Sequence, residues 1–394
     1  MMSPVMMKSW VKKGDQIGIP AVLMRGGTSK GLYFKREDLP ENKELLDKIL
    51  LSLYGSPDVR QIDGIGGGDP LTSKAIIVGK SHKENVDIEY TFCQVGIDKP
   101  QVSYGGNCGN MLAGVGPFAI DEGLIEGTDP MTVIRILNLN TNQIIIAKVP
   151  TKDGKALTEG EYAIAGVPKP GAEIKLTFIN PQPTFGKLLP TGNPVDVVEI
   201  ENHMIHVSFI DATTPFIFVD SEDLGFLGVN GSEDVKEITS NEKLMITLEN
   251  IRSIAAKWLN LVEKAEDATN KTPNIPRVAY VSKPKTPNED IIVRQMSMQR
   301  VHKAFSVTGA ICIAVASTIK GTVINKIISA PESGETQIRI AHPSGVMNVS
   351  AGFTEFSGKM ERSVTISRTA RRIMSGYVFI QQRELFSEDV KQSN

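Results

Sequence analysis

The sequence predicts an α/β chain made of two similar halves, each with a β-sheet curled around one buried helix. Three observations support this fold class: short apolar runs punctuated by Gly and Pro, two helical segments that are apolar on every side, and a weak match between those two segments. The chain has 394 residues, which exceeds one ordinary core, because single domains average roughly 150 residues.

Strands are expected where short apolar runs end in turn-forming residues. In the first half such runs cover residues 19–24, 31–34, 75–78, 88–93, 132–137 and 143–149. In the second half they cover residues 203–210, 216–219, 278–281, 291–295, 336–341 and 363–367. Ordinary helices are expected over 45–53 and 241–262, and the apolar stripe of the longer one is typical of a packed scaffold helix.

Two other helices are expected over residues 109–122 and 309–319, and their apolar surface on every side predicts burial. The segment that begins at Cys108 aligns weakly with the segment that begins at Ser306. This match indicates an internal repeat with one buried helix in each copy.

The domain boundary is expected where Pro and Gly crowd together, between Pro181 and Pro194. Such a segment punctuates the chain, since neither residue type continues a helix or a strand well. We therefore expect a first domain over residues 1–185 and a second over residues 186–394.

Charge and composition exclude several classes of protein. The 43 Lys and Arg against 45 Asp and Glu leave a net charge of −2, which argues against a nucleic-acid partner. No run approaches the ~18 apolar residues of a membrane-spanning helix, and the first residues lack the apolar core of a secretory signal. Three cysteines, Cys93, Cys108 and Cys312, cannot form a disulfide framework, so a reducing, cytoplasmic compartment is expected.

A glycine-rich turn precedes the first buried helix and is a candidate catalytic segment. Free amides at a helix start, together with the helix dipole, favour an anion and lower the pKa of a thiol. Cys108 is therefore a candidate acid, base or nucleophile beside a bound carboxylate. The alternative is a structural cysteine in a tight turn. The neighbouring substrate-binding candidates are Asn107, Gly109, Asn110 and Met111.

A second glycine loop, residues 63–70, leads into Ser73, Lys74 and an apolar strand. Partial burial lowers the pKa of a lysine and makes it a candidate general base. Lys74 is thus a candidate catalytic residue, with Ser73 beside it for binding. The alternative is a surface lysine after a flexible loop, since lysines are mostly exposed.

The segment 25–31, which follows a predicted strand, resembles a phosphate loop only superficially. It lacks the Gly-Lys-Ser/Thr order and leads into a strand instead of a helix. The glycines of 63–68 also lack the strand and helix of a dinucleotide fingerprint. No nucleotide is therefore expected, and a small anion held by Arg25, Thr28 and Ser29 remains the interpretation.

In the second half, polar residues gather around the second buried helix. The binding candidates there are Arg294, Met298, Thr308, Gly309, His342 and Ser344. Arg277 is a weaker candidate for holding a carboxylate. His302 and His342 could equally be structural, as single histidines usually are. The five histidines form no metal set, and no HExxH or paired CxxC occurs, so no metal is expected.

These features together favour proton transfer on a small polycarboxylate, without a cofactor, because several anion-holding turns accompany one thiol and one candidate base. The segments that carry them resemble the 2-methylaconitate cis-trans isomerase family. The matching segments run in order along the chain: residues 19–31 (IPAVLMRGGTSKG), 63–68 (DGIGGG), 72–74 (TSK), 107–111 (NCGNM), 116–119 (GPFA), 294–302, 342–345 (HPSG) and 368–372 (RTARR).

The resemblance implies a diaminopimelate epimerase-like fold. In that fold two pseudo-symmetric halves, each a curled, mainly antiparallel sheet around a central helix, enclose the site between them. The end of the chain, about residues 375–386, is then expected to pack back on the first half. Epimerases of this fold oppose one cysteine from each half, whereas here Ser306 stands in the second position. The isomerase branch is similar in keeping one cysteine and recruiting a lysine, which correspond to Cys108 and Lys74.

The activity implied is cis-trans or double-bond isomerisation of an unsaturated tricarboxylate, with 2-methylaconitate as the first candidate, in propionate catabolism through the 2-methylcitrate cycle. The alternatives are an oxalomesaconate-type tautomerase of the same family and a non-catalytic polycarboxylate-binding protein. A homodimer and a functional pairing with an aconitase-like dehydratase are compatible with the resemblance.

Overall fold

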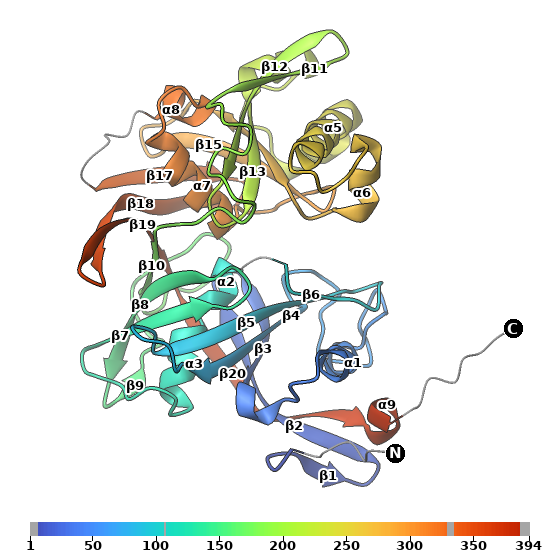
Figure 1. Cartoon of the computed structure of the whole chain (residues 1–394), viewed down its shortest axis with the longest axis vertical. Helices are drawn as coiled ribbons and strands as arrows, with labels where there is room; N and C mark the ends of the chain where they lie inside the picture. Colours follow the sequence, from blue (N-terminus) through green and yellow to red (C-terminus); the bar gives the residue numbers. More distant parts are fainter. Residues whose placement is uncertain (1–6, 106–107, 329–334, 387–394) are drawn as a thin grey trace, which may run out of the picture.

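The computed structural model describes residues 7–105, 108–328 and 335–386, and these form two lobes (Figure 1). The first lobe is built on β1 (Val11–Lys13), β2 (Gln16–Gly26), β3 (Ser29–Lys35), β4 (Lys74–Lys80), β5 (Ile88–Val95), β6 (Val102–Ser103), β7 (Met131–Asn138), β8 (Gln143–Lys152), β9 (Lys155–Ala156) and β10 (Ile174–Ile179). The second is built on β11 (Asp196–Ile200), β12 (His203–Asp211), β13 (Pro215–Asp220), β14 (Arg277–Ser282), β15 (Ile291–Ser297), β16 (Arg300–Val301), β17 (Thr336–His342), β18 (Gly345–Phe356) and β19 (Lys359–Arg368).

The two lobes repeat one strand order. In the first, β2 pairs antiparallel with β3, β3 lies parallel to β4, β4 pairs antiparallel with β5, and β5 lies parallel to β7, which pairs antiparallel with β8. In the second, β12, β13, β14, β15, β17 and β18 repeat these pairings and directions. This is the internal repeat that the match between the two buried helices indicated.

One arginine–aspartate bridge recurs in both copies and supports the repeat. Nε and Nη2 of Arg135 donate to the two carboxylate oxygens of Asp87, at 3.1 and 2.7 Å respectively. Arg339 binds Asp290 in the same way, also at 3.1 and 2.7 Å. In each case the backbone amide of the arginine also bonds to the same aspartate.

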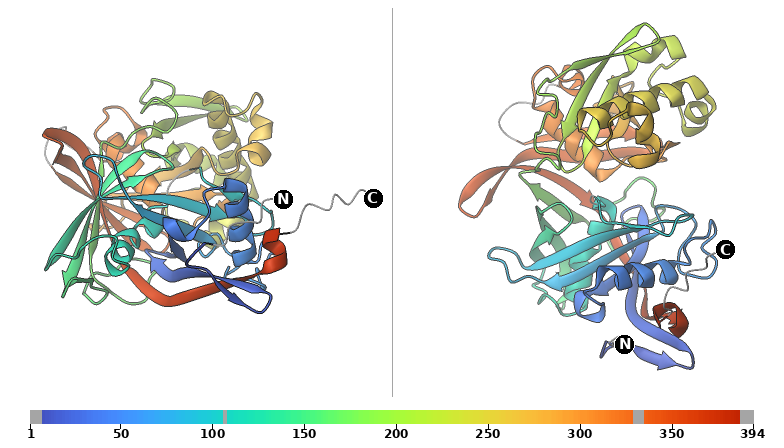
Figure 2. Two further views of the ribbon diagram at one scale, coloured as in Figure 1. Left: turned by 60° about the horizontal axis from the view of Figure 1, so that its bottom comes forward. Right: turned by 45° about the vertical axis from the view of Figure 1, so that its right-hand side comes forward.

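The lobes share one continuous sheet, because β10 pairs with β8 on one side and with β19 on the other. After β19 the chain turns into β20 (Ala370–Gln381), which runs along β2 in the first lobe (Figures 1 and 2). Its last residues, Tyr377–Gln381, lie opposite residues 16–20. The end of the chain thus contributes an edge strand to the first lobe. The Pro-rich segment 181–194 lies between β10 and β11.

Each lobe has one buried inner helix region. In the second lobe it is α7 (Val307–Ser317), which is buried at every position. In the first lobe it is divided into α2 (Gly109–Leu112) and α3 (Val115–Asp121). Pro117 explains the division, since it lacks the N–H that would bond to the carbonyl four residues earlier. The single helix expected over 109–122 was therefore wrong in its continuity, although its burial is confirmed.

The remaining helices lie outside these two. The longest are α1 (Lys43–Tyr54), which packs on the first lobe, and α5 (Glu242–Trp258), which packs on the second (Figure 2). The shorter ones are η1 (Arg36–Asp38), η2 (Ser221–Leu227), α4 (Val235–Ser240), η3 (Ala265–Asp267), α6 (Ala268–Lys271), α8 (Val323–Ile327) and α9 (Gln382–Phe386). Within the described ranges, no helix is both long and apolar enough to cross a membrane.

The inner helices and the inner faces of both sheets form one apolar core. Phe118 of α3 and Ile311 of α7 belong to it, together with Ile134 and Ile340 from the two sheets. A core shared by both lobes holds them together, because separating them would return buried apolar surface to water.

Candidate active site

The starts of the two inner helices meet at the junction of the lobes. A Cβ at Gly109 would overlap the side chain of Val307, so the first turns of α2 and α7 are in direct contact. Cys108 precedes α2 and Ser306 precedes α7. The hydroxyl of Ser306 accepts a hydrogen bond from the amide of Gly309 at 3.2 Å, whereas Cys108 makes no such capping bond. Cys108 is half-buried and its thiol is available for chemistry.

Lys74 is the first residue of β4 and is buried, with 7% of its surface exposed. Its Nζ donates to Oε1 of Gln94 and lies 5.3 Å from the ring centre of Phe92. The Gln94 amide is oriented by its own bonds to two backbone carbonyls. Burial lowers the pKa of Lys74, a negative charge on Cys108 would raise it, Arg277 lowers it further, and Asp69 has a smaller raising effect.

Arg277 is the first residue of β14 and therefore takes the place of Lys74 in the second repeat. Its Nη1 donates to Oγ1 of Thr308 at a long 3.3 Å, and its Cζ lies 5.8 Å from the ring centre of Phe216. Its Nε is buried and has no hydrogen-bond partner in the described structure. Burial lowers the pKa of Arg277, and a negative charge on Cys108 would raise it.

Lys74, Cys108 and Arg277 thus form one electrostatic group, although they come from three distant segments. No Asp or Glu side chain of the described residues forms an ion pair with Lys74 or Arg277. Buried cations without a counter-charge are costly unless an anion is supplied. The arrangement is suited to an anionic ligand.

A cavity of about 70 Å³ lies at the junction of the lobes, and Lys74, Cys108 and Arg277 are not among its lining residues. It is lined by Thr28, Asn110, Tyr162, Ala163, Ile164, Ala165, Ala304, Phe305, His342, Val346, Met347, Asn348 and Arg368. Three of the binding candidates, Thr28, Asn110 and His342, are therefore on its wall. Nδ2 of Asn110 donates to Oγ1 of Thr28 at 3.0 Å, which orients both side chains.

Two buried histidines are neutral at pH 7: His302, which interacts electrostatically with Arg277 and Lys74, and His342, which interacts with Arg368 and Arg294. Burial lowers the pKa of both His302 and His342 to about 4. In each ring Nδ1 accepts a backbone amide, from Ala304 at 3.1 Å and from Ser344 at 3.2 Å. Nε2 therefore carries the proton, and each ring is a hydrogen-bond donor that adds no charge. Among the described residues, no group of three His, Cys, Asp or Glu is placed to hold a metal ion.

Three other polar candidates have their side chains bound to the protein. Arg25 donates to the carbonyls of Gly27 and Thr369, both at 2.9 Å. Arg294 donates through Nε to the carbonyl of Glu233 at 2.6 Å. Ser73 donates to Oε1 of Gln61 at 2.7 Å. These bonds give the three side chains a structural role, which the sequence pattern does not distinguish from binding.

The last candidates differ widely in exposure. Met111 is fully buried in the core and Ser29 is 2% exposed without a hydroxyl partner, whereas Met298 is 43% exposed. The exposed Ser344 donates to the carbonyl of Lys303. Asn107 lies outside the described residues.

The glycines of segment 25–31 serve close packing. Gly27 has φ +51°, and a Cβ there would overlap the side-chain amide of Asn110. A Cβ at Gly31 would overlap the carbonyl oxygen of Lys74, its partner across β3 and β4. Backbones can approach this closely only where no side chain intervenes. The segment therefore positions Asn110 and Lys74.

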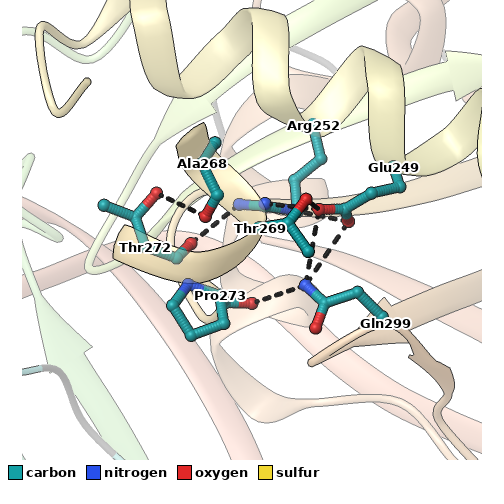
Figure 3. Close-up of polar contacts among 7 residues, drawn as sticks. All are labelled: Glu249, Arg252, Ala268, Thr269, Thr272, Pro273 and Gln299. Atoms are coloured by element: carbon teal, nitrogen blue, oxygen red, sulfur yellow. Dashed lines mark hydrogen bonds and ion pairs between the residues drawn. The ribbon is translucent and has the colours of Figure 1, made fainter. Parts of the chain in front are cut away.

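A polar network supports the segment that leads to Arg277 (Figure 3). Arg252 of α5 binds Glu249 at 2.6 Å and donates to the carbonyl of Thr272 at 2.8 Å. Gln299, in the turn between β15 and β16, donates to the Glu249 carboxylate at 3.4 Å. The network joins α5, the segment before β14 and that turn, so it holds the start of β14 in place.

The PrpF protein family matches residues 16–381. The chain belongs to this family. The match confirms the family expected from the sequence. Its relatives also show that the protein is an isomerase.

Three characterised relatives align along nearly their whole length. The 3-methylitaconate isomerase of Eubacterium barkeri is 42% identical, over 94% of this chain and 99% of its own. The 2-methyl-aconitate isomerase of Shewanella oneidensis is 37% identical, over 92% and 97%. The 4-oxalomesaconate tautomerase of Pseudomonas putida is 38% identical, over 93% and 97%.

Solved structures agree with the predicted fold class. A crystal structure of methylitaconate-delta-isomerase has a TM-score of 0.80 at 40% identity, covering 95% of this chain and 99% of its own. A hydroxyproline epimerase of Agrobacterium vitis has a TM-score of 0.56 at 11% identity, over 94% of each chain. The second likeness concerns the fold alone, and it confirms the epimerase-like architecture.

Proposed function

We propose that the protein isomerises a small unsaturated tricarboxylate by moving an allylic proton, with 2-methylaconitate as the first candidate. The observation that carries the proposal is Lys74, a buried amine of lowered pKa, together with the buried cation Arg277 and the thiol of Cys108, with no carboxylate of the described residues in an ion pair with Arg277. The substrate's own carboxylates would supply the missing negative charge.

In the proposed reaction, neutral Lys74 removes a proton from the carbon next to the alkene, so a C–H bond breaks and an N–H bond forms. The electron pair delocalises through the alkene into a carboxylate, which gives a dienolate. Arg277 stabilises the charge that develops there, as preorganised donors do in low-dielectric sites. Return of the proton to the same carbon after rotation gives cis-trans isomerisation, and return to the third carbon shifts the double bond.

Cys108 has two assignments in this scheme. It either returns the proton or positions the substrate against Lys74. Replacement by serine separates them, because an alcohol keeps the size and polarity of the side chain but is a far weaker acid. Retained turnover in Cys108→Ser supports positioning, whereas a loss comparable to that of Lys74→Ala supports proton return.

The test is proton NMR in D2O with 2-methylaconitate, 3-methylitaconate and 4-oxalomesaconate offered separately. We expect isomerisation of at least one acid, with deuterium entering the product at the reacting carbon. Failure of all three acids to react or to take up deuterium would overturn the proposal.

A second candidate is tautomerisation of an oxalomesaconate-type acid. It is supported by the 38% identity to a relative with that name, and it requires the same proton abstraction. The NMR comparison decides between the two by the relative kcat/KM values. A cytoplasmic location, a homodimer and pairing with an aconitase-like dehydratase stay predictions.

A further inference from the structure

We propose that Arg368 binds a second carboxylate of the substrate, remote from the reacting carbon, inside the cavity between the lobes. This inference rests on the proposed function for the identity of the substrate. It assigns the choice between tricarboxylates and dicarboxylates to one residue at the end of β19.

Arg368 is a buried cation that the protein does not neutralise. It is 4% exposed. Its Nε donates to Oδ1 of Asn110 at 3.2 Å and its Nη1 to the carbonyl of Ser367 at 2.8 Å. Its Nη2 reaches only the Sδ of Met347, at 3.0 Å, among the described residues. A thioether is a weak acceptor, so one face of the guanidinium lacks a proper partner.

The charge persists at neutral pH, because burial lowers the pKa of Arg368 only to about 10. No ion pair to Arg368 occurs within the described parts of the chain, in contrast to Arg135 and Arg339. An isolated buried charge is unfavourable, and a carboxylate is the group that best matches a guanidinium, through two parallel hydrogen bonds. An incoming carboxylate would relieve the unfavourable burial.

The cavity has the size and the lining for such a group. Its volume of about 70 Å³ exceeds the roughly 10–15 Å³ that one water requires. Asn110 and His342 contribute fixed polar groups, and His342 is neutral with its proton on Nε2. Apolar side chains such as Phe305 and Val346 complete the wall and favour a carbon chain behind the carboxylate.

Residues on the cavity wall are sequence neighbours of the proposed reaction centre and are linked to it by electrostatic interactions. Asn110 lies two residues after Cys108, and Phe305 directly precedes Ser306. His342 interacts electrostatically with Arg368 and with His302, which in turn interacts with Arg277 and Lys74. In this proposal, one carboxylate of the ligand lies at Arg277 and another at Arg368.

The test uses two saturated acids that cannot isomerise, tricarballylate and methylsuccinate, with affinities from isothermal titration calorimetry. We expect the native protein to bind the tricarboxylate about 10- to 100-fold more tightly, as one charged hydrogen-bonded contact provides. In Arg368→Gln this preference should vanish, and in Arg368→Lys part of it should return. Arg135→Gln removes an arginine far from the cavity and should keep the preference.

A second variant tests the same proposal by keeping Arg368 and supplying it with a carboxylate from the protein. Met347→Glu would place a carboxylate against Nη2 of Arg368, so it should also remove the preference while keeping the arginine. A preference that persists in both Arg368→Gln and Met347→Glu overturns the inference, as does its absence in the native protein. Failure of the proposed function is distinguishable, since the native protein would then show the Arg368-dependent preference without isomerising any unsaturated acid.

Discussion

Replacing Lys74 tests the assignment of the general base, because activity and stability should change in opposite directions. Lys74→Ala removes the group that abstracts the proton, and lost general bases lower rates by about 100-fold or more. Lys74→Met keeps most of the side-chain volume in the buried site at the start of β4. We expect the same loss of turnover from both variants.

The effect on stability follows from the direction of the pKa shift. Burial lowers the pKa of Lys74 in the folded protein, so the unfolded chain binds more protons at pH values between the folded and the unfolded pKa. Stability therefore rises with pH through that window, and the cost of burying the charge is present in full below the folded pKa. Lys74→Met removes that cost and should raise the unfolding midpoint at neutral pH.

The assays are steady-state kinetics across pH and thermal unfolding of the same samples. In the native protein kcat/KM should rise with pH through a pKa below the ordinary 10.5 of lysine. Lys80→Met, at the exposed opposite end of β4, is the matched control and should keep both activity and stability. Near-normal turnover in Lys74→Met would remove Lys74 from the mechanism, and a lower unfolding midpoint would refute the account of its burial.

Three further predictions concern the surroundings of the base. Arg277→Gln should lower kcat/KM by about 10- to 100-fold, since it removes a charged hydrogen bond to the dienolate, and initial rates at substrate concentrations well below KM check it. Gly31→Ala should lower the free energy of unfolding, measured in urea, by about 1–3 kcal/mol, because the new Cβ overlaps the backbone of Lys74. Gly225→Ala is the control and should change stability little, because its new Cβ has no atom within 4 Å. Glu249→Gln should lower the free energy of unfolding by about 3 kcal/mol or more, because it leaves the buried Arg252 without its ion pair. This loss should be accompanied by weaker substrate binding at Arg277. An unchanged midpoint of urea unfolding would contradict the supporting role of the network.

Much of the fold could be predicted from local patterns. The inner helices were found because a helix apolar on every side has no face for water. β10 and most of β20 were missed, because their residues are mixed in polarity and their strand character comes from pairing with distant partners. β18 was missed although both of its partners, β17 and β19, adjoin it in sequence. The division between α2 and α3 was missed, although Pro117 was the available signal.

The catalytic candidates also divide into those with a local signal in the sequence and those without one. Lys74 and Cys108 were expected because each follows a glycine-rich loop and opens a buried element, which is a local property of the sequence. The local sequence pattern favours Arg277 only weakly and gives no specific signal for Arg368. The equivalence of Arg277 and Lys74 is visible only in the strand pairing, because the sequence match between Cys108 and Ser306 does not align these two residues.

The sequence by itself determined the two-part architecture, the family and the two residues that open β4 and α2, since all of these depend on local periodicity and on ordered motifs. Only the tertiary structure shows which arginines keep a buried guanidinium nitrogen without a strong acceptor. Arg25 and Arg294 meet backbone carbonyls supplied by other segments, whereas Nε of Arg277 meets no acceptor and Nη2 of Arg368 meets only a sulfur. The physical reason is that the surroundings of a guanidinium are assembled from chain segments hundreds of residues apart, and these come together only on folding.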